Sequence, residues 1–314
     1  MKISLAKPSK RIAHLGPVGT NAETAAQAYV NWLSRETNSE CTLYPYSTIS
    51  QALEASASGL VDFSIVPVEN SIEGSVTVTL DTLWRLDALR IKHALVLPIS
   101  HALLSNAPNL NEIQKVYSHP QALAQCQLWL AEFIPQAQLI PANSTTEALH
   151  YLEDSSIAAI SSPRAAELYK LPVLASPIND YPDNYTRFWI LGSDAGKLGN
   201  FAESHESSIT SGATLAANSH LDSTSANCTH TSLAFSVPAN MPGTLVKPLQ
   251  VFASRGINLS RIESRPTKRS LGEYIFFMDV EADAGSTHGN FKNLWLLHCT
   301  VSSMIVLILR GLAR

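Results

Sequence analysis

Short apolar segments alternate with helical patterns between residues 11 and 192, and this alternation limits the possible folds more than any other feature of the chain. Strands joined by helices are typical of an α/β domain with mostly parallel strands, because a parallel connection needs a long crossover. We therefore expect an α/β domain over this range. Its expected strands are residues 12–15, 63–68, 116–118, 157–160 and 188–191.

Three expected helices begin with capping boxes, in which a hydroxyl residue is followed three positions later by Glu or Gln. They are TNAE from Thr20, SHPQ from Ser118 and STTE from Ser144. Several helix starts follow a strand directly, so we expect their free amide groups to collect on one side of the sheet. Free amides and the helix dipole favour anions, which indicates an anion-binding edge.

A second module follows a segment of different composition. Residues 193–230 are rich in Ser, Thr, Asn, Ala and Gly, which predicts a flexible linker. Beyond it we expect a strand at 232–237, a helix at 242–255 and strands at 257–262 and 274–280. This order is the first part of a ferredoxin-like βαββαβ module. A helix at 291–298 and a strand at 303–309 would complete it.

Composition excludes several classes of protein. With 22 Lys+Arg against 26 Asp+Glu the formal charge is −4, which leaves no basic surface for nucleic acid or anionic lipid. No apolar run approaches the roughly 20 residues of a membrane span, and the N-terminus lacks a secretory signal pattern. Four scattered cysteines without metal-ligand spacing indicate free thiols and no metal site. We therefore expect a cytoplasmic protein that binds neither nucleic acid nor membranes.

Two motifs follow expected strands in the first part of the chain. GPVGT (residues 16–20) suits a tight turn that brings backbone amides close to a ligand, with Thr20 capping the next helix, although such a turn is also common as plain structure. VPVENSIEG (residues 66–74) places Glu69, Asn70 and Ser71 at the carboxyl end of a strand, the usual ligand position in an α/β sheet. The same three residues also suit a capped turn.

Two further motifs lie in the middle of the domain. SHPQAL (residues 118–123) presents Ser118, His119 and Gln121 together, and His119 is a possible general acid or base or a packed turn residue. ISSPRAAEL (residues 160–168) places Ser161 before a helix opened by proline, where it suits an anion cradle.

NYTRF (residues 184–188) supplies a hydroxyl at Thr186 and, at Arg187, a guanidinium fork that can bind a carboxylate through two hydrogen bonds. Neither a dinucleotide fingerprint nor a P-loop is present, and no nucleophilic triad is evident. The motifs therefore indicate noncovalent chemistry on an anionic substrate.

Together, in this order, GPVGT, VPVENSIEG, SHPQALAQC, SSPRAA and NYTRF resemble the catalytic domain of prephenate dehydratases, over residues 11–192. PGTLVKPL (residues 242–249) and RIESRP (residues 261–266) are similar to the phenylalanine-binding motifs of the ACT domain that regulates this family. The resemblance implies a two-lobed catalytic domain like a type II periplasmic binding protein at 11–192, the linker at 193–230, and an ACT domain at 231–314.

The resemblance also implies the reaction. Prephenate loses its ring hydroxyl as water and its ring carboxylate as CO2 to give phenylpyruvate, a carbon-oxygen lyase reaction in phenylalanine biosynthesis that needs no cofactor or metal. Phenylalanine would bind the ACT domain as a feedback inhibitor, and the protein would assemble as a dimer or tetramer.

Residue roles are carried over onto the matching motifs. Thr186 would donate a hydrogen bond or proton to the departing hydroxyl, with Glu69 as a second proton donor and Asn70 and Gln121 completing the catalytic set. The expected substrate-binding residues are Thr20, Ser71, Ser118, His119, Ser161, Arg187 and Phe188. The expected phenylalanine-binding residues are Gly243, Thr244, Leu245, Asn258, Leu259, Glu263, Ser264, Arg265 and Pro266.

The chain departs from the family pattern at three places. Asn21 follows GPVGT where the family usually has an aromatic residue, Thr244 stands in the first effector motif, and residues 287–314 are apolar and basic instead of ending in the usual acidic helix and strand. We expect no chorismate mutase domain before Gly16. Two alternatives remain open: an arogenate dehydratase, and a noncatalytic sensor of amino acids or anions on the same fold.

Overall fold

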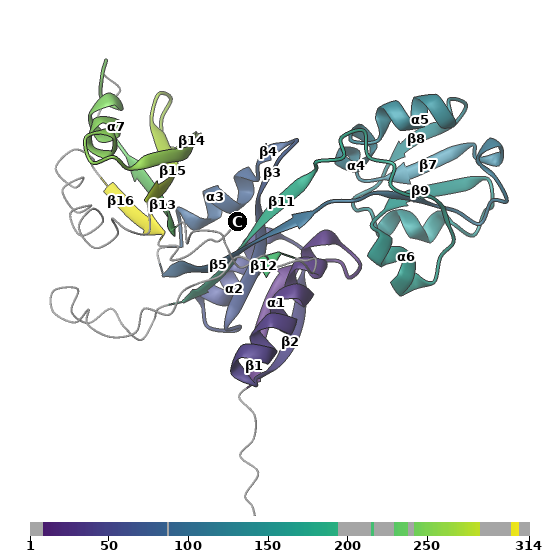
Figure 1. Ribbon diagram of the computed structural model, residues 1–314, viewed down its shortest axis with the longest axis horizontal. Helices are drawn as coiled ribbons and strands as arrows, with labels where there is room; N and C mark the ends of the chain where they lie inside the picture. The colour runs from purple at the N-terminus through teal and green to yellow at the C-terminus, as the bar shows by residue number, and fades with distance from the viewer. Residues whose placement is uncertain are drawn as a thin grey trace, which may run out of the picture. The chain divides into compact units, whose positions relative to one another are not determined.

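The computed structural model describes residues 9–86, 88–193, 215–216, 229–237, 242–282 and 303–307 (Figure 1). The chain forms two compact units. The first contains Met1–Ala52, Ile65–Ser75 and Val96–Phe188, and the second contains Leu53–Ser64, Val76–Leu95 and Trp189–Arg314. No described helix is long and apolar enough to cross a membrane.

The first sheet has the strand order β12-β5-β11-β3-β1-β2, with β4 paired to β3. Strands β1 and β2 are parallel, with Ser9 opposite Glu40, and helix α1 connects them. The strands are β1 (Ser9–Leu15), β2 (Glu40–Tyr46), β3 (Phe63–Asn70), β4 (Gly74–Ser75), β5 (Leu89–Pro98), β11 (Tyr185–Ser193) and β12 (Leu215–Ala216). The helices between them are α1 (Asn21–Thr37), α2 (Ile49–Ala57) and α3 (Thr77–Leu83).

The second sheet has the order β10-β6-β9-β7-β8. Strand β7 is parallel to β8 and β9, whereas β6 is antiparallel to β9 and β10. The strands are β6 (Ala102–Leu104), β7 (Lys115–Ser118), β8 (Gln138–Pro141), β9 (Ile157–Ser161) and β10 (Val173–Ala175). The helices are α4 (Pro120–Ala124), α5 (Gln127–Phe133) and α6 (Pro163–Tyr169), with 3-10 turns η1 (Leu110–Glu112) and η2 (Glu147–Tyr151). Buried aliphatic side chains pack on both faces of this sheet, as expected for an α/β domain of two lobes.

The third sheet is antiparallel, with the order β14-β15-β13-β16. Its strands are β13 (Thr229–Ser236), β14 (Asn258–Pro266), β15 (Tyr274–Ala282) and β16 (Ser303–Leu307), and α7 (Val246–Ala253) follows β13. The order confirms the ferredoxin-like prediction, including the last strand, of which the structure describes Ser303–Leu307. The expected helix at 291–298 and most of the expected linker lie outside the described residues.

The helix starts confirm one capping prediction and correct two. Thr20 caps α1, its side chain accepting a hydrogen bond from the Glu23 backbone amide. The Ser118 prediction is wrong: Pro120 occupies the first helical position of α4, so the cap moves to His119, whose Nδ1 accepts from the Gln121 amide. Ser144 does accept from the Glu147 amide, but the segment winds into the 3-10 turn η2.

Candidate functional site

Asn70 forms the centre of a group of buried polar side chains at the end of β3. Its Nδ2 donates to Asn184 Oδ1 at 2.8 Å, to Thr186 Oγ1 at 2.9 Å and to the Tyr185 carbonyl at 3.2 Å. Its Oδ1 accepts from the backbone amides of residues 72 and 73, both at 3.0 Å. Both ends of the amide are therefore held, and Asn70 has a single orientation.

Thr186 lies on β11, beside β3 in the first sheet, and its side chain is buried. Because Thr186 Oγ1 accepts the hydrogen bond from Asn70, its own hydrogen is directed away from Asn70. The arrangement leaves one hydroxyl hydrogen that can be donated to a bound substrate.

Two neighbouring residues of the motifs are placed at the ends of the same strands. Arg187 Nη2 lies 3.4 Å from Glu69 Oε2, and each side chain is about one third exposed. Ion pairs as exposed as this contribute little stability, so both groups can exchange their partner for a ligand at small cost. Ser71 Oγ donates to the Asp183 carbonyl and accepts from the Tyr185 amide, so it fastens the end of β3 to β11.

The sequence prediction missed Gln125. Its Oε1 accepts from Asn184 Nδ2 at 2.8 Å and from His101 Nε2 at 3.1 Å, and its Nε2 donates to Glu73 at 3.2 Å. Burial lowers the pKa of His101, although the bond to Gln125 acts in the opposite direction, so the imidazole stays neutral near pH 7. Gln125 is buried one helical turn after the exposed Gln121, within SHPQALAQC, and no local pattern in the sequence distinguishes the two glutamines.

Four predicted residues have other contacts or surroundings. Ser118 is buried and its Oγ donates to the Ile160 carbonyl at 2.7 Å. Ser161 Oγ, at the end of β9, is fully buried and lacks a hydrogen-bond partner among the described residues. His119 caps α4, and Phe188 is a core side chain of β11. Of these, the Ser161 hydroxyl is the one that a bound oxygen atom would satisfy.

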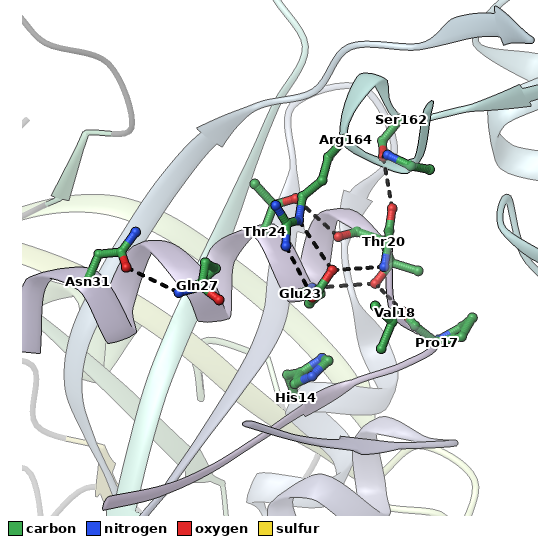
Figure 2. A network of polar contacts seen from close by, with 12 residues as sticks. His14, Pro17, Val18, Thr20, Glu23, Thr24, Gln27, Asn31, Ser162 and Arg164 are labelled. Carbon is green, nitrogen blue, oxygen red and sulfur yellow. Dashed lines mark hydrogen bonds and ion pairs between the residues drawn. The ribbon is translucent and has the colours of Figure 1, made fainter. Parts of the chain in front are cut away.

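Close to β1, the GPVGT turn packs against the start of α6, as Figure 2 shows through the side chains of Ser162 and Arg164. Thr20 Oγ1 donates to the Pro17 carbonyl at 2.9 Å and accepts from the Glu23 amide at 3.4 Å. The Thr20 hydroxyl therefore binds both the GPVGT turn before it and the first turn of α1 after it, as an N-cap residue does.

The predicted effector residues lie on the third sheet and the turn before α7. Gly243 adopts a φ of +79°, which only glycine reaches without strain, and Leu245 and Leu259 pack against the core of this sheet. Asn258 donates to Glu281 at 3.3 Å, and Glu263 pairs with Arg261 at 3.1 Å. The turn before α7 also contains Thr244, and β14 contains Ser264 and Pro266.

Arg265 makes the strongest ionic contact of the predicted effector motif. Its Nε and Nη2 donate to the two carboxylate oxygens of Asp81 on α3, both at 3.1 Å, and Lys268 Nζ lies 2.7 Å from the same carboxylate. Burial acts to raise the pKa of Asp81, but the bonds from Arg265 and Lys268 outweigh it and hold that pKa below its usual value. The carboxylate is therefore ionised at neutral pH.

No group of three or more His, Cys, Asp or Glu side chains within the described part of the chain is arranged to hold a metal ion.

Comparison with known proteins identifies the family of this chain. Residues 12–196 match the family described as prephenate dehydratase, and residues 231–287 match the ACT domain. A prephenate dehydratase of Lactococcus lactis subsp. cremoris is 36% identical over 277 residues, 87% of this chain and 88% of that protein. One of Bacillus subtilis is 34% identical over 301 residues, 93% and 96% of the two chains.

A solved structure is also similar over nearly the whole chain. The prephenate dehydratase of Arthrobacter aurescens in complex with L-Phe is 31% identical, with a TM-score of 0.72, and the match covers 97% of this chain and 90% of that one. These matches confirm the family expected from the motifs, both in the catalytic region and in the regulatory region. This chain belongs to the prephenate dehydratase family and carries a C-terminal ACT domain.

Proposed function

We propose that this chain converts prephenate to phenylpyruvate and that the Thr186 hydroxyl assists the departing ring hydroxyl. The observation that carries the mechanism is the bond from Asn70 Nδ2 to Thr186 Oγ1, which turns the hydroxyl hydrogen away from Asn70. A hydrogen aimed at the substrate would stabilise negative charge as it develops on the leaving oxygen.

The step balances without an oxidant or metal. The ring C–O bond breaks, the bond to the ring carboxylate breaks to release CO2, and the electron pair of that bond completes the aromatic ring. The departing hydroxide takes one proton and leaves as water. Thr186 donates a hydrogen bond to this oxygen. Glu69 would supply the proton in its protonated form, after a substrate carboxylate has replaced it beside Arg187.

The remaining predicted residues would hold the substrate. Arg187 would exchange Glu69 for a substrate carboxylate, and the unpartnered Ser161 hydroxyl would donate to another oxygen. Gln121, His119 and Thr20 stay part of this proposal as side chains that orient the substrate. Ser71, Ser118 and Phe188 support the strands that carry the site, as their contacts with backbone and core indicate.

The structure adds two residues to the proposed site, Asn184 and Gln125, which were not among the predicted site residues. Gln125 fixes Asn184, and Asn184 Oδ1 in turn accepts from Asn70. Their role is to hold the Asn70 amide with its nitrogen facing Thr186.

We further propose feedback inhibition by phenylalanine at the ACT domain, between neighbouring copies in a dimer or tetramer. The Arthrobacter relative was solved with L-Phe. The pairing of Arg265 with Asp81 supports a route to the site, because α3, which carries Asp81, follows the Glu69–Ser75 segment in the chain. The proposed extents are 11–192 for the catalytic domain, 193–230 for the linker and 231–314 for the ACT domain, in a cytoplasmic enzyme.

The test is a mass-spectrometric product assay of the purified protein with prephenate and arogenate in parallel. Phenylpyruvate formed above the spontaneous background, and faster than phenylalanine is formed from arogenate, supports the proposal. The reverse preference assigns the chain to arogenate, and no turnover by a folded sample favours the noncatalytic sensor. Thr186→Val should abolish turnover and Thr186→Ser, which keeps the hydroxyl, should retain part of it.

A further inference from the structure

The backbone of Gly19, in the GPVGT turn, is fastened at both of its polar groups. Its amide donates to Glu23 Oε2 at 2.8 Å, and its carbonyl accepts from Ser162 Oγ at 2.8 Å. Glu23 belongs to α1 beside the first sheet, whereas Ser162 follows β9 of the second sheet. The backbone of one residue therefore connects α1 of the first sheet with the segment that follows β9 of the second.

An ion pair reinforces this connection. Arg164 donates from Nε to Glu23 Oε2 and from Nη2 to Oε1, both at 3.3 Å, in the paired geometry that a guanidinium and a carboxylate prefer (Figure 2). The Glu23 side chain is nearly buried. Removing Arg164 would thus leave the Glu23 carboxylate poorly solvated, whereas Arg164 itself is about one third exposed.

The turn is also closely packed. Gly19 has a φ of +90°, and a Cβ atom there would lie 3.1 Å from Thr146 Cγ2 and 3.2 Å from Tyr169 Cε2. Tyr169 Oη additionally donates to the Val18 carbonyl at 3.4 Å. The turn consequently has little room to shift against α6 and η2.

The contact between Gly19 and Ser162 would fix the position of the neighbouring residue, Ser161. It directly precedes Ser162, which both caps α6 and donates to Gly19. The Ser161 hydroxyl is fully buried without a partner among the described residues, so its hydrogen is available for a hydrogen bond. The position of Ser162 therefore sets the direction of this free donor.

We propose that Glu23 and Arg164 are positioning residues for substrate binding: their ion pair holds the GPVGT turn on Ser162 and so fixes the Ser161 hydroxyl where it donates to a carboxylate oxygen of the substrate. This inference rests on the proposed function, because it takes the substrate to be an anionic carboxylate. Neither residue contacts the reacting atoms in this proposal.

The experiment compares Glu23→Gln, Arg164→Gln and the double variant with the wild-type protein. Glu167→Gln, which changes an exposed carboxylate on the same helix α6, is the matched control. The readouts are KM and kcat for prephenate, and calorimetric binding of phenylpyruvate, which carries a carboxylate. We expect each single variant to raise KM and the phenylpyruvate Kd about tenfold with kcat changed less than threefold. We expect Arg164→Lys to restore part of the loss.

The double variant decides whether the two residues act as a pair. It should be no worse than the more affected single variant, because either change already breaks the contact. Wild-type KM and Kd in both single variants, with only thermal stability lowered, would overturn the inference, and so would losses that multiply in the double variant. If the wild-type protein binds phenylpyruvate but does not turn over prephenate, the proposed function fails while the binding comparison still decides this inference. A wild-type protein that neither binds phenylpyruvate nor turns over prephenate would overturn both.

Discussion

Substituting Asn70 with Asp tests the direction of the Thr186 hydroxyl. The change replaces the donor Nδ2 with an oxygen while the shape of the side chain is kept. That oxygen would face Asn184 Oδ1 at 2.8 Å and the Tyr185 carbonyl at 3.2 Å, neither of which has a hydrogen to give. Thr186, 2.9 Å away, would be the one neighbour of the three able to donate, and its hydrogen would turn toward the carboxylate and away from the substrate.

The magnitude follows from the lost bonds. One buried acceptor, Asn184 Oδ1, loses its donor, whereas the Tyr185 carbonyl keeps the bond from the Ser71 amide at 2.8 Å. This predicts a fall in the free energy of unfolding of about 1–3 kcal/mol. Loss of a positioned hydrogen-bond or proton donor costs about 10²–10⁴ in rate, so we expect kcat to fall by that factor. Burial and facing acceptors also favour the protonated form of the new carboxyl, so its pKa should be raised and the stability defect should shrink on acidification.

The assay measures phenylpyruvate formation at pH 7–8 and unfolding in urea. Asn106→Asp is the matched control, since Asn106 Nδ2 donates to the Leu152 carbonyl at 2.7 Å in the region of the second sheet, remote in sequence from the site. Because Asn106 is exposed, the control should lose less stability than Asn70→Asp and should keep nearly wild-type kcat. A folded Asn70→Asp protein with more than about a tenth of the wild-type kcat would refute the reasoning, because the hydroxyl would then not need Asn70 to orient it.

Three further changes probe other contacts. Gly19→Ala introduces a Cβ 3.2 Å from Tyr169 at a φ of +90°, so the free energy of unfolding in urea should fall by about 1–3 kcal/mol, and an unchanged value would contradict the close packing. Asp81→Asn weakens the attachment of Arg265, so phenylalanine should inhibit less while uninhibited turnover is kept, and an unaltered inhibition curve would exclude this route. Burial acts to raise the Glu23 pKa, but bonds from Arg164 and Gly19 outweigh it and lower that pKa; the stabilisation is therefore present above the unfolded pKa of about 4.3 and lost as pH falls through the folded value. The stability difference between the wild type and Glu23→Gln should accordingly shrink between pH 6 and pH 3 in denaturant titrations.

Local patterns in the sequence were sufficient to predict several strands of the fold. The apolar segments at 12–15, 63–68 and 116–118 lie within β1, β3 and β7, because burial on both sides leaves a continuous apolar run. Strand β5 was missed, since Arg90, Lys92 and His93 interrupt such a run. The pattern of apolar residues thus identifies strands that form a continuous apolar run more readily than strands that also contain charged residues.

The polar site was predicted in part for a different reason. Asn70 and Thr186 were selected because each follows or begins a strand in a recognisable motif, but their contact joins residues 116 positions apart. Gln125 was missed because the first turn of α4 offered Gln121, and only the three-dimensional packing shows which glutamine reaches Asn184. Side-chain partners that come from different lobes of an α/β domain carry no local signal in one sequence.

The departure of the C-terminal segment from the family pattern does not remove the last strand of the third sheet. β16 pairs with β13 over five residues, from Ser232 opposite Leu307 to Ser236 opposite Ser303. Strand pairing depends mainly on backbone groups and on a side-chain pattern that fits a pleated surface, so an apolar, β-branched sequence such as SMIVL can replace an unrelated one. The strand order expected of an ACT domain therefore survives a change of sequence.

A threonine is an unusual choice as an acid, because an alcohol gives up its proton far less readily than a carboxyl or an imidazole does. The chemistry of this family relaxes that demand: loss of CO2 and water creates an aromatic ring, so the departing hydroxyl needs a fixed donor more than a strong acid. Orientation then matters more than acidity. The proposed role of Thr186 needs only such a fixed donor: Asn70 donates to its hydroxyl oxygen, and Asn70 is itself held by Asn184 and by two backbone amides. The contribution of this polar group to the rate should therefore lie in holding one hydrogen in place.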